Sequence, residues 1–238
     1  NFGWNLWRGL LSERSAVCTI DLPNAALTDI QIGAEWVALA SQIIYEGTGE
    51  DVDIIGHSQG GLVPRWAIKY FSPGRFEVDD YIGLASPNHG TLVADSFVFG
   101  CFESCWQMKT TSMFLEALNS GDETPFATDY TSIYSASDEL VQPIGTQDLD
   151  GGTNILLQDI CPGRPVDHVG IAADNLTWRL ILDALKNEGA ADPSSLPDDI
   201  CTTGQMPGTT YPDPAHFPPN WGDGHFTDRE PELKPYAR

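Results

Sequence analysis

The 238-residue sequence has little positive charge: 12 lysines and arginines stand against 34 aspartates and glutamates, and the formal net charge is -22. Because this charge repels nucleic acids and anionic lipid surfaces, we expect an uncharged substrate and no nucleic acid partner. The sequence also contains no apolar run of membrane-spanning length and no internal repeat. Its 41% hydrophobic content is enough for one domain with a two-sided core.

The five cysteines lack the paired C-x-x-C spacing and the nearby histidines of a zinc site. We therefore expect no metal and no other cofactor, and we interpret the cysteines as disulfide partners. Their odd number leaves one thiol unpaired, which we expect to be Cys18. Cys101 and Cys105 can pair only if residues 100–106 form a loop, because a regular helix holds positions i and i+4 somewhat too far apart.

Asn175-Leu176-Thr177 matches the N-glycosylation sequon, although such a short match also arises by chance. The acidic composition fits an extracellular protein or simply a solvated anionic surface. We expect a secreted, monomeric protein with Asn175 as a glycosylation candidate.

A short apolar stretch beginning at Val52 runs directly into residues 56–60, Gly-His-Ser-Gln-Gly. This G-x-S-x-G pattern is typical of a nucleophile elbow, a sharp strand-to-helix turn that exposes a serine hydroxyl. Glycine at both ends of the pattern would allow neighbouring backbone to pass close to the turn. Apolar residues at helical spacing follow, including Leu62 and Trp66, so the pattern lies in the context that an elbow requires and points to Ser58 as a nucleophile.

The hydrophobic pattern along the chain predicts helices that alternate with strands, which indicates a mostly parallel sheet covered by helices on both faces. The predicted strands are 16–20, 52–55, 81–85, 131–136 and 155–160. The predicted helices end near residues 11 and 47 or include 62–70, 113–118 and 176–185. One face of the helix that ends near residue 47 carries Ile32, Trp36, Leu39 and Ile43. Residues 190–238 are rich in proline and turn residues, so we expect them to wrap the surface of a single domain, 1–238, as irregular coil.

A serine nucleophile needs an imidazole base that a carboxylate orients, and in elbow folds these follow in the order serine, acid, histidine. That order excludes His57 and His89. Of the remaining histidines, His168 follows shortly after a predicted strand, whereas His216 and His225 lie in the proline-rich coil.

The acid is predicted from the segment after the strand that ends near residue 136, where Asp138 and Glu139 are adjacent. Asp138 comes first after the strand and is favoured, but spacing alone leaves Glu139 open. Asp167 is a weaker alternative because it is next to the base in the sequence.

Several stretches resemble the family of Candida antarctica lipase B: residues 58–63 (SQGGLV), 134–143 (YSASDELVQP), the pair Asp167-His168 and the terminal residues 235–238 (PYAR). The resemblance covers most of residues 4–185. It implies an α/β-hydrolase fold, a secreted serine lipase or acyltransferase without a metal, and Asp138 as the acid of the triad. It also implies that the Gln59 backbone N–H belongs to the oxyanion hole and that His57 and Leu140 line the substrate pocket.

The same resemblance implies a Cys161–Cys201 disulfide and places the partner of Cys18 upstream of Asn1. A strand beside the nucleophile strand, with a loop that supplies a threonine oxyanion donor, also lies upstream in this family. We therefore expect the chain to lack that strand and loop, so that its sheet has a gap beside the nucleophile strand.

These observations predict a serine hydrolase that cleaves carboxylic esters of lipids through an acyl-enzyme, as triacylglycerol lipases do, with transfer to alcohols. A carboxylesterase, polyester hydrolase or amidase would use the same triad, and a non-catalytic lipid-binding module is the alternative of another class. The apolar side chains between Phe97 and Trp106 fit contact with a lipid interface or packing under a disulfide-pinned loop equally well.

Overall fold

The computed structural model describes residues 4–12, 15–209 and 226–238. Its centre is a parallel sheet in the order β1 (Val52–His57), β2 (Val78–Leu84), β3 (Asp129–Tyr134) and β4 (Thr153–Leu156). The helices are α1 (Trp4–Leu11), α2 (Ile30–Thr48), α3 (Gln59–Phe71), α4 (Leu92–Asp95), α5 (Glu103–Gln107), α6 (Met113–Asn119), α7 (Leu157–Ile160) and α8 (Asn175–Ala184).

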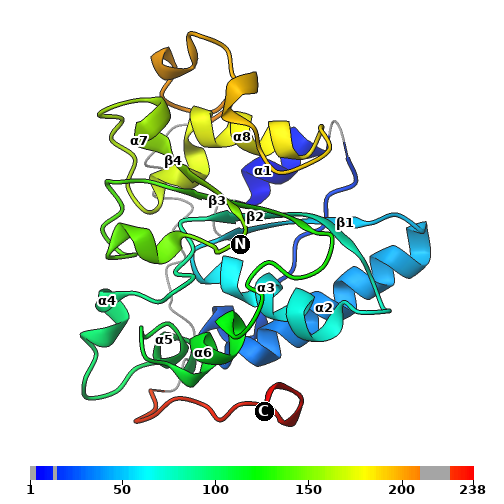
Figure 1. The fold of residues 1–238 in the computed structure, drawn as a ribbon, viewed down its shortest axis with the longest axis vertical. Helices are drawn as coiled ribbons and strands as arrows, with labels where there is room; N and C mark the ends of the chain where they lie inside the picture. Colours follow the sequence, from blue (N-terminus) through cyan, green and yellow to red (C-terminus); the bar gives the residue numbers. More distant parts are fainter. Residues whose placement is uncertain (1–3, 13–14, 210–225) are drawn as a thin grey trace.

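Helices cover both faces of the sheet, with α1 and α8 on one side and α2, α3 and α6 on the other (Figure 1). Each side has its own hydrophobic core. Trp7 of α1 and Trp178 of α8 meet edge to face on the first side, while Trp66 of α3 stacks on Phe114 of α6 on the second. The sheet lies between the two cores, and loops follow the carboxyl ends of its strands.

Side-chain caps fix where several helices begin. Asp29 accepts a hydrogen bond from the N–H of Gln31 at the start of α2, Ser112 accepts one at the start of α6, and Asp174 accepts two at the start of α8. Such caps satisfy N–H groups that have no partner inside the helix. At its other end, α2 stops at Gly49, whose φ of 75° is in the left-handed region that glycine adopts readily.

Strand β1 is the least buried member of the sheet. Among the described residues it pairs with β2 alone, and most of its side chains are half-buried, whereas all but one residue of β2 are buried. Within the part of the chain that the structure describes, one edge of β1 is therefore free of a neighbouring strand.

Two predicted strands differ in the structure. Residues 16–20 form no strand, because an extended segment becomes a strand only beside a partner and none lies next to it among the described residues. The run 155–160 divides into the end of β4 and the short helix α7. A short apolar run does not distinguish a strand from a buried helix, which explains the second error.

Helix α2 is where predicted, but its predicted apolar face is not the buried one. Trp36, Leu39 and Ile43 are 52%, 54% and 61% exposed, while Ala34, Val37 and other small residues of the helix are buried. The close approach of α2 to α3 requires small side chains at the contact, so the large apolar residues face outward.

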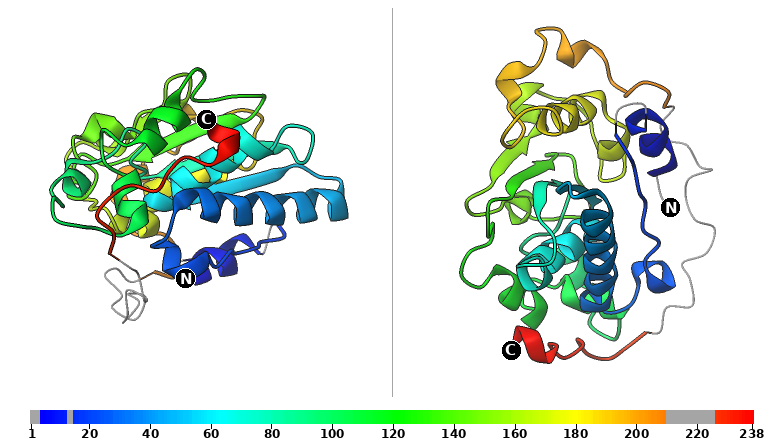
Figure 2. Two further views of the ribbon diagram at one scale, coloured as in Figure 1. Left: turned by 90° about the horizontal axis from the view of Figure 1, so that it is seen from below. Right: turned by 90° about the vertical axis from the view of Figure 1, so that its right-hand side faces the viewer.

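The proline-rich region lies at the two ends of the molecule. Residues 190–205 cover the end near α7 and α8, and residues 226–238 run along the opposite end beside α5 and α6 (Figures 1 and 2). Glu230 of the latter segment accepts hydrogen bonds from the N–H groups of Met113 and Phe114, at the start of α6. Gln31 of α2 bonds the backbone of both Glu232 and Lys234. Among the helices that the structure describes, none has the length and apolar character needed to span a membrane.

Candidate active site

Ser58 lies in the sharp turn between β1 and α3. Its φ of 56° and ψ of -131° are rare for a residue with a side chain, and such local strain is typical of functional turns. A Cβ added at Gly56 would lie 2.2 Å from the carbonyl oxygen of Gly60, so position 56 requires glycine. The expectation for Gly60 is wrong, because an added Cβ there meets no atom within 4 Å; the second position that requires glycine is Gly61, where a Cβ would lie 1.9 Å from the Ser86 Oγ.

Ser58, His168 and Asp138 form one chain of hydrogen bonds, although 110 residues separate the first two in the sequence. The distance from Ser58 Oγ to His168 Nε2 is 2.9 Å, and that from His168 Nδ1 to Asp138 Oδ2 is also 2.9 Å. Since a carboxylate only accepts, Nδ1 carries the proton and Nε2 is left to accept one from the serine. The exposed fractions of Asp138 and His168 are 2% and 4%, so water does not compete for these bonds.

Backbone donors hold the Asp138 carboxylate in place. The N–H groups of Leu140 and Val141 both donate to its Oδ1 over 2.8 Å. The neighbouring Glu139, which the sequence left open as the acid, instead accepts the backbone N–H of His168 over 3.0 Å. Glu139 thus contacts the loop of the base, and Asp138 contacts its ring.

His57 lies directly before Ser58 and contacts the His168 loop. Its Nε2–H donates to the carbonyl oxygen of His168 over 2.8 Å, and the two rings are 5.0 Å apart. Burial, and then the neighbouring His168, lower the pKa of His57 to about 4. His57 is therefore neutral near pH 7. The sequence predicted it only as a pocket residue, because nothing in a linear motif shows a bond to a backbone carbonyl far along the chain.

Gln59 directly follows Ser58, and Leu140 lies on the loop of Asp138. Gln59 is the first residue of α3, so its backbone N–H has no partner within the helix and lies beside Ser58. Its side chain donates to the carbonyl oxygen of Ala26 over 2.6 Å, which ties the elbow to the segment before α2. The Leu140 side chain is 42% exposed on the acid loop.

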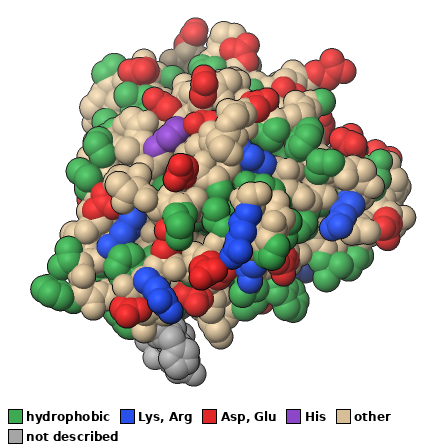
Figure 3. Space-filling model, turned by 60° about the horizontal axis from the view of Figure 1, so that its bottom comes forward, with side chains coloured by type: hydrophobic (Ala, Val, Ile, Leu, Met, Phe, Trp, Pro, Cys, Tyr) green, Lys and Arg blue, Asp and Glu red, His purple; other side chains and the backbone are tan. Residues whose placement is uncertain are grey.

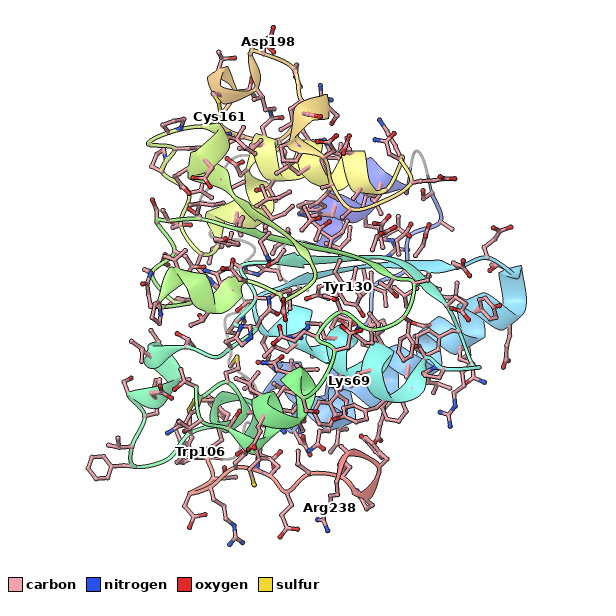
Figure 4. The ribbon with its side chains drawn as sticks, in the orientation of Figure 1. Lys69, Trp106, Tyr130, Cys161, Asp198 and Arg238 are labelled. Carbon is pink, nitrogen blue, oxygen red and sulfur yellow. A yellow bond between two sulfur atoms is a disulfide. The ribbon has the colours of Figure 1, made fainter. Side chains whose placement is uncertain are left out.

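Both predicted disulfides are present, Cys101–Cys105 and Cys161–Cys201, and Cys18 is free and exposed. Cys101 precedes α5 and Cys105 lies within it, so the first pair forms across the start of a helix rather than inside a full loop. The Cys161 disulfide lies at the end of the molecule that also carries Asp198 (Figure 4).

The other predicted residues are distributed as follows. Asp167 accepts a hydrogen bond from the N–H of Gly170, and His89 pairs with Glu123, so neither takes part in the triad. Asn175 begins α8 and is half-buried, with the sequon residue Thr177 fully buried. His216 and His225 lie outside the described residues.

A cavity of about 560 Å³ lies behind the His168 loop, against the Cys161–Cys201 disulfide. Two of its charged groups are already paired, because Arg164 Nε donates to Asp174 Oδ2 over 2.7 Å. Ser58 is not in its lining. We therefore do not assign the reacting group of a substrate to this cavity.

The comparisons with known proteins agree with this arrangement. Residues 42–159 match the family described as Lipase (class 2). Lipase B of Pseudozyma antarctica is 29% identical over 242 residues, which cover 93% of this chain and 70% of that protein. The crystal structure of Aspergillus fumigatus lipase B is similar with a TM-score of 0.82 and 31% identity, covering 92% of this chain.

The chain is thus similar to two proteins named lipase B. Its sheet and helices are those of an α/β-hydrolase, and the mature lipase BlEst2 of Bacillus licheniformis shares this fold, with a TM-score of 0.53 over 65% of this chain and 74% of that one at 17% identity. The chain spans 58% of the length of the Aspergillus fumigatus lipase B structure that it matches.

Proposed function

We propose that this chain carries the triad of an enzyme that hydrolyses carboxylic esters of lipids through an acyl-enzyme, as triacylglycerol lipases do. The observation that supports the proposal most directly is the continuous chain of hydrogen bonds from Ser58 Oγ through His168 to Asp138. Similarity to two lipases named lipase B supports a lipid ester as the substrate class.

In the proposed cycle, His168 Nε2 takes the proton of Ser58 as its Oγ bonds to the ester carbonyl carbon. The resulting imidazolium gives this proton to the leaving alcohol when the ester C–O bond breaks. Water then attacks the acyl-serine and loses a proton to His168, which passes it to Ser58 Oγ as the acyl C–O bond breaks and the carboxylic acid leaves. An alcohol in place of water yields a new ester. Asp138 holds the ring and stabilises its positive form throughout.

The negative oxygen of each tetrahedral intermediate needs backbone or side-chain donors. The Gln59 N–H, at the start of α3, is our proposed donor within the described residues. We propose that a further donor comes from a strand that pairs with the free edge of β1, as the resemblance to the family implies. The half-exposed side chains of β1 support this arrangement.

Apolar side chains near the acid loop support contact with lipid. Leu92, Val98 and Phe99 are 54%, 67% and 101% exposed. Their segment is tied to the acid loop, because the N–H of Leu92 donates to the carbonyl oxygen of Gln142 over 2.8 Å. A lipid surface that meets these side chains would thus lie close to the loop that carries Asp138.

Two disulfides fit an oxidising compartment, so we propose that the protein is secreted, and we retain the expectation of a monomer. A single elution volume by gel filtration, independent of protein concentration, would agree with a monomer. A volume that shifts with concentration would contradict it.

The test of the proposed function is Ser58→Ala. We expect hydrolysis of p-nitrophenyl esters to fall by at least about 10⁴-fold, and fluorophosphonate labelling to be lost. Ser15→Ala, which changes an exposed serine away from the site, is the matched control and should keep both. Activity or labelling that survives in Ser58→Ala would remove the proposal.

The substrate class is tested with the chain length of the ester. A lipase should hydrolyse long-chain esters in an emulsion, whereas a carboxylesterase should act only on short, dissolved esters. Release of amines from anilides would instead indicate an amidase.

A further inference from the structure

Three aspartates converge at the amino ends of β1 and β2, at the edge of the sheet opposite Ser58. The pairing of the two strands passes from Val52 opposite Val78 to Ile54 opposite Tyr81, so one residue of β1, Asp53, faces two residues of β2, Asp79 and Asp80. This is a β-bulge, which turns side chains away from their regular alternation. One carboxylate oxygen from each aspartate lies within 4.8 Å of the other two.

The buried member of this cluster lacks a partner. Asp80 is 4% exposed, and its Oδ1 has no hydrogen bond in the part of the chain that the structure describes. A buried polar atom without a partner is costly, and a buried carboxylate more so. Asp138, another buried aspartate, accepts two N–H groups and an imidazole.

No positive side chain balances the cluster. Within residues 4–12, 15–209 and 226–238, none of the three aspartates forms an ion pair with lysine, arginine or histidine. The ionised cluster therefore needs a positive charge from outside the chain.

We infer that Asp53, Asp79 and Asp80 form a Ca²⁺ site that links the amino ends of β1 and β2. Ca²⁺ prefers carboxylate oxygens at 2.3–2.6 Å, so two of its ligands lie at most roughly 5 Å apart, which fits the observed cluster. Mg²⁺ requires shorter bonds and near-ideal octahedral geometry, and Zn²⁺ prefers nitrogen and sulfur. Water molecules complete the coordination.

This site departs from the expectation of no metal, which depended on the absence of zinc-type spacing among cysteines and histidines and on the resemblance to a family without a metal. A calcium site has no such sequence motif here, because its three ligands come from two strands and are brought together by the β-bulge. The cation would fasten β1, the strand that ends at Ser58, to its neighbour β2. Its role is structural.

The experiment uses the whole chain, stripped with EDTA and then titrated with CaCl₂ by calorimetry in about 0.15 M NaCl, which screens weak attraction to a charged surface. Such screening is necessary because acidic side chains are spread over the face in Figure 3, with few lysines and arginines among them. We expect one saturable site and a rise in Tm of about 5 °C at Ca²⁺ well above its Kd. Mg²⁺ at the same concentration should raise Tm less.

Asp80→Asn and Asp53→Asn should each abolish the saturable heat and the rise in Tm. Asp198→Asn, which removes an exposed carboxylate at another end of the molecule (Figure 4), is the matched control and should keep both. Using two cluster variants keeps the test valid if one of them fails to fold. The inference is overturned if CaCl₂ yields neither saturable heat nor a shift, or if the cluster variants and Asp198→Asn respond equally.

Discussion

Buried carboxylates near the two ends of β1 differ in their hydrogen-bond partners. At the carboxyl end, Asp138 is 2% exposed and its oxygens accept two backbone N–H groups and the imidazole of His168. At the amino end, Asp80 is 4% exposed, and its Oδ1 has no partner among the described residues. The same side chain with the same burial is thus satisfied at one end and unsatisfied at the other.

This difference shows that the role of a carboxylate does not follow from its burial alone. A buried acid that the chain itself surrounds with donors is ready to orient a base. A buried acid among other acids requires a proton or a cation. The partners of a buried carboxylate, rather than its burial, therefore indicate its role.

The largest effect is expected when Asp138, the acid with hydrogen-bond partners, is replaced. Asp138→Asn should lower kcat for ester hydrolysis by about 10⁴-fold, because the amide favours the wrong tautomer of His168. Initial rates on p-nitrophenyl esters measure the loss.

Glu139→Gln is the control for Asp138→Asn, because Glu139 accepts the backbone N–H of His168, whereas Asp138 bonds its ring. We expect it to lower kcat by about tenfold at most, since an amide oxygen still accepts that hydrogen bond. If the two variants lose activity equally, the assignment of Asp138 as the acid fails.

Alanine substitutions at the two glycines of the elbow test how tightly the backbone is packed at the carboxyl end of β1. Gly56→Ala should destabilise the fold by about 3 kcal/mol or more, because the new Cβ would lie 2.2 Å from the carbonyl oxygen of Gly60. Gly60→Ala meets no atom and should change stability by at most about 1 kcal/mol. Urea unfolding of both variants measures the difference, and equal midpoints would show that this clash is relieved.

The pH dependence of stability sharpens the comparison at the carboxyl end. His57 has a pKa of about 4 in the folded chain, lowered by burial and by His168, against 6.5 ordinarily. Between these values the unfolded chain binds a proton that the folded chain does not. Stability is therefore lost as the pH falls from 6.5 towards 4, by up to about 3 kcal/mol. The negative charge of Asp138 acts in the opposite direction and raises the pKa of His57.

His57→Gln keeps a donor for the His168 carbonyl but does not titrate, so it should lose this part of the pH dependence. His89→Gln is the control with the opposite sign, since the bond to Glu123 raises the pKa of His89. That group stabilises the fold below its ordinary pKa and loses its effect as the pH rises. Urea midpoints measured from pH 4 to 8 would contradict the account if His57→Gln kept the slope of the parent.

The smallest effect is expected at the amino end. With cations removed by EDTA, Asp79→Asn should raise stability by about 0.5 kcal/mol, because it relieves repulsion between adjacent carboxylates. Removing the satisfied Asp138 should instead lower stability. A precise urea midpoint, compared with Asp198→Asn, measures this gain, and a loss of stability in Asp79→Asn would end the contrast between the two edges.

The sequence was most informative where residues in a short motif must act together. The segments around Ser58, Asp138 and His168 each follow a predicted strand, and the carboxyl ends of parallel strands meet at one edge, so their convergence could be expected. The disulfide of Cys161 came from the resemblance to the family.

Other features depend on contacts that no local pattern contains. Residues 16–20 have the composition of a strand but no neighbour to pair with among the described residues. The face of α2 with Trp36 and Leu39 looked like a buried face, yet close packing against α3 selects the small residues instead. The acidic cluster arises from a bulge, which shifts the register by one residue and leaves no mark in the composition.

The anchored segment at residues 230–238 has a practical consequence. Glu230 accepts hydrogen bonds from two N–H groups in the first turn of α6, and Gln31 bonds the backbone of Glu232 and Lys234. Arg238 lies at the surface beyond them (Figure 4). Removing residues 230–238 would take away the Glu230 acceptor at the start of α6 and the backbone that Gln31 of α2 bonds, so this segment is part of the packed structure.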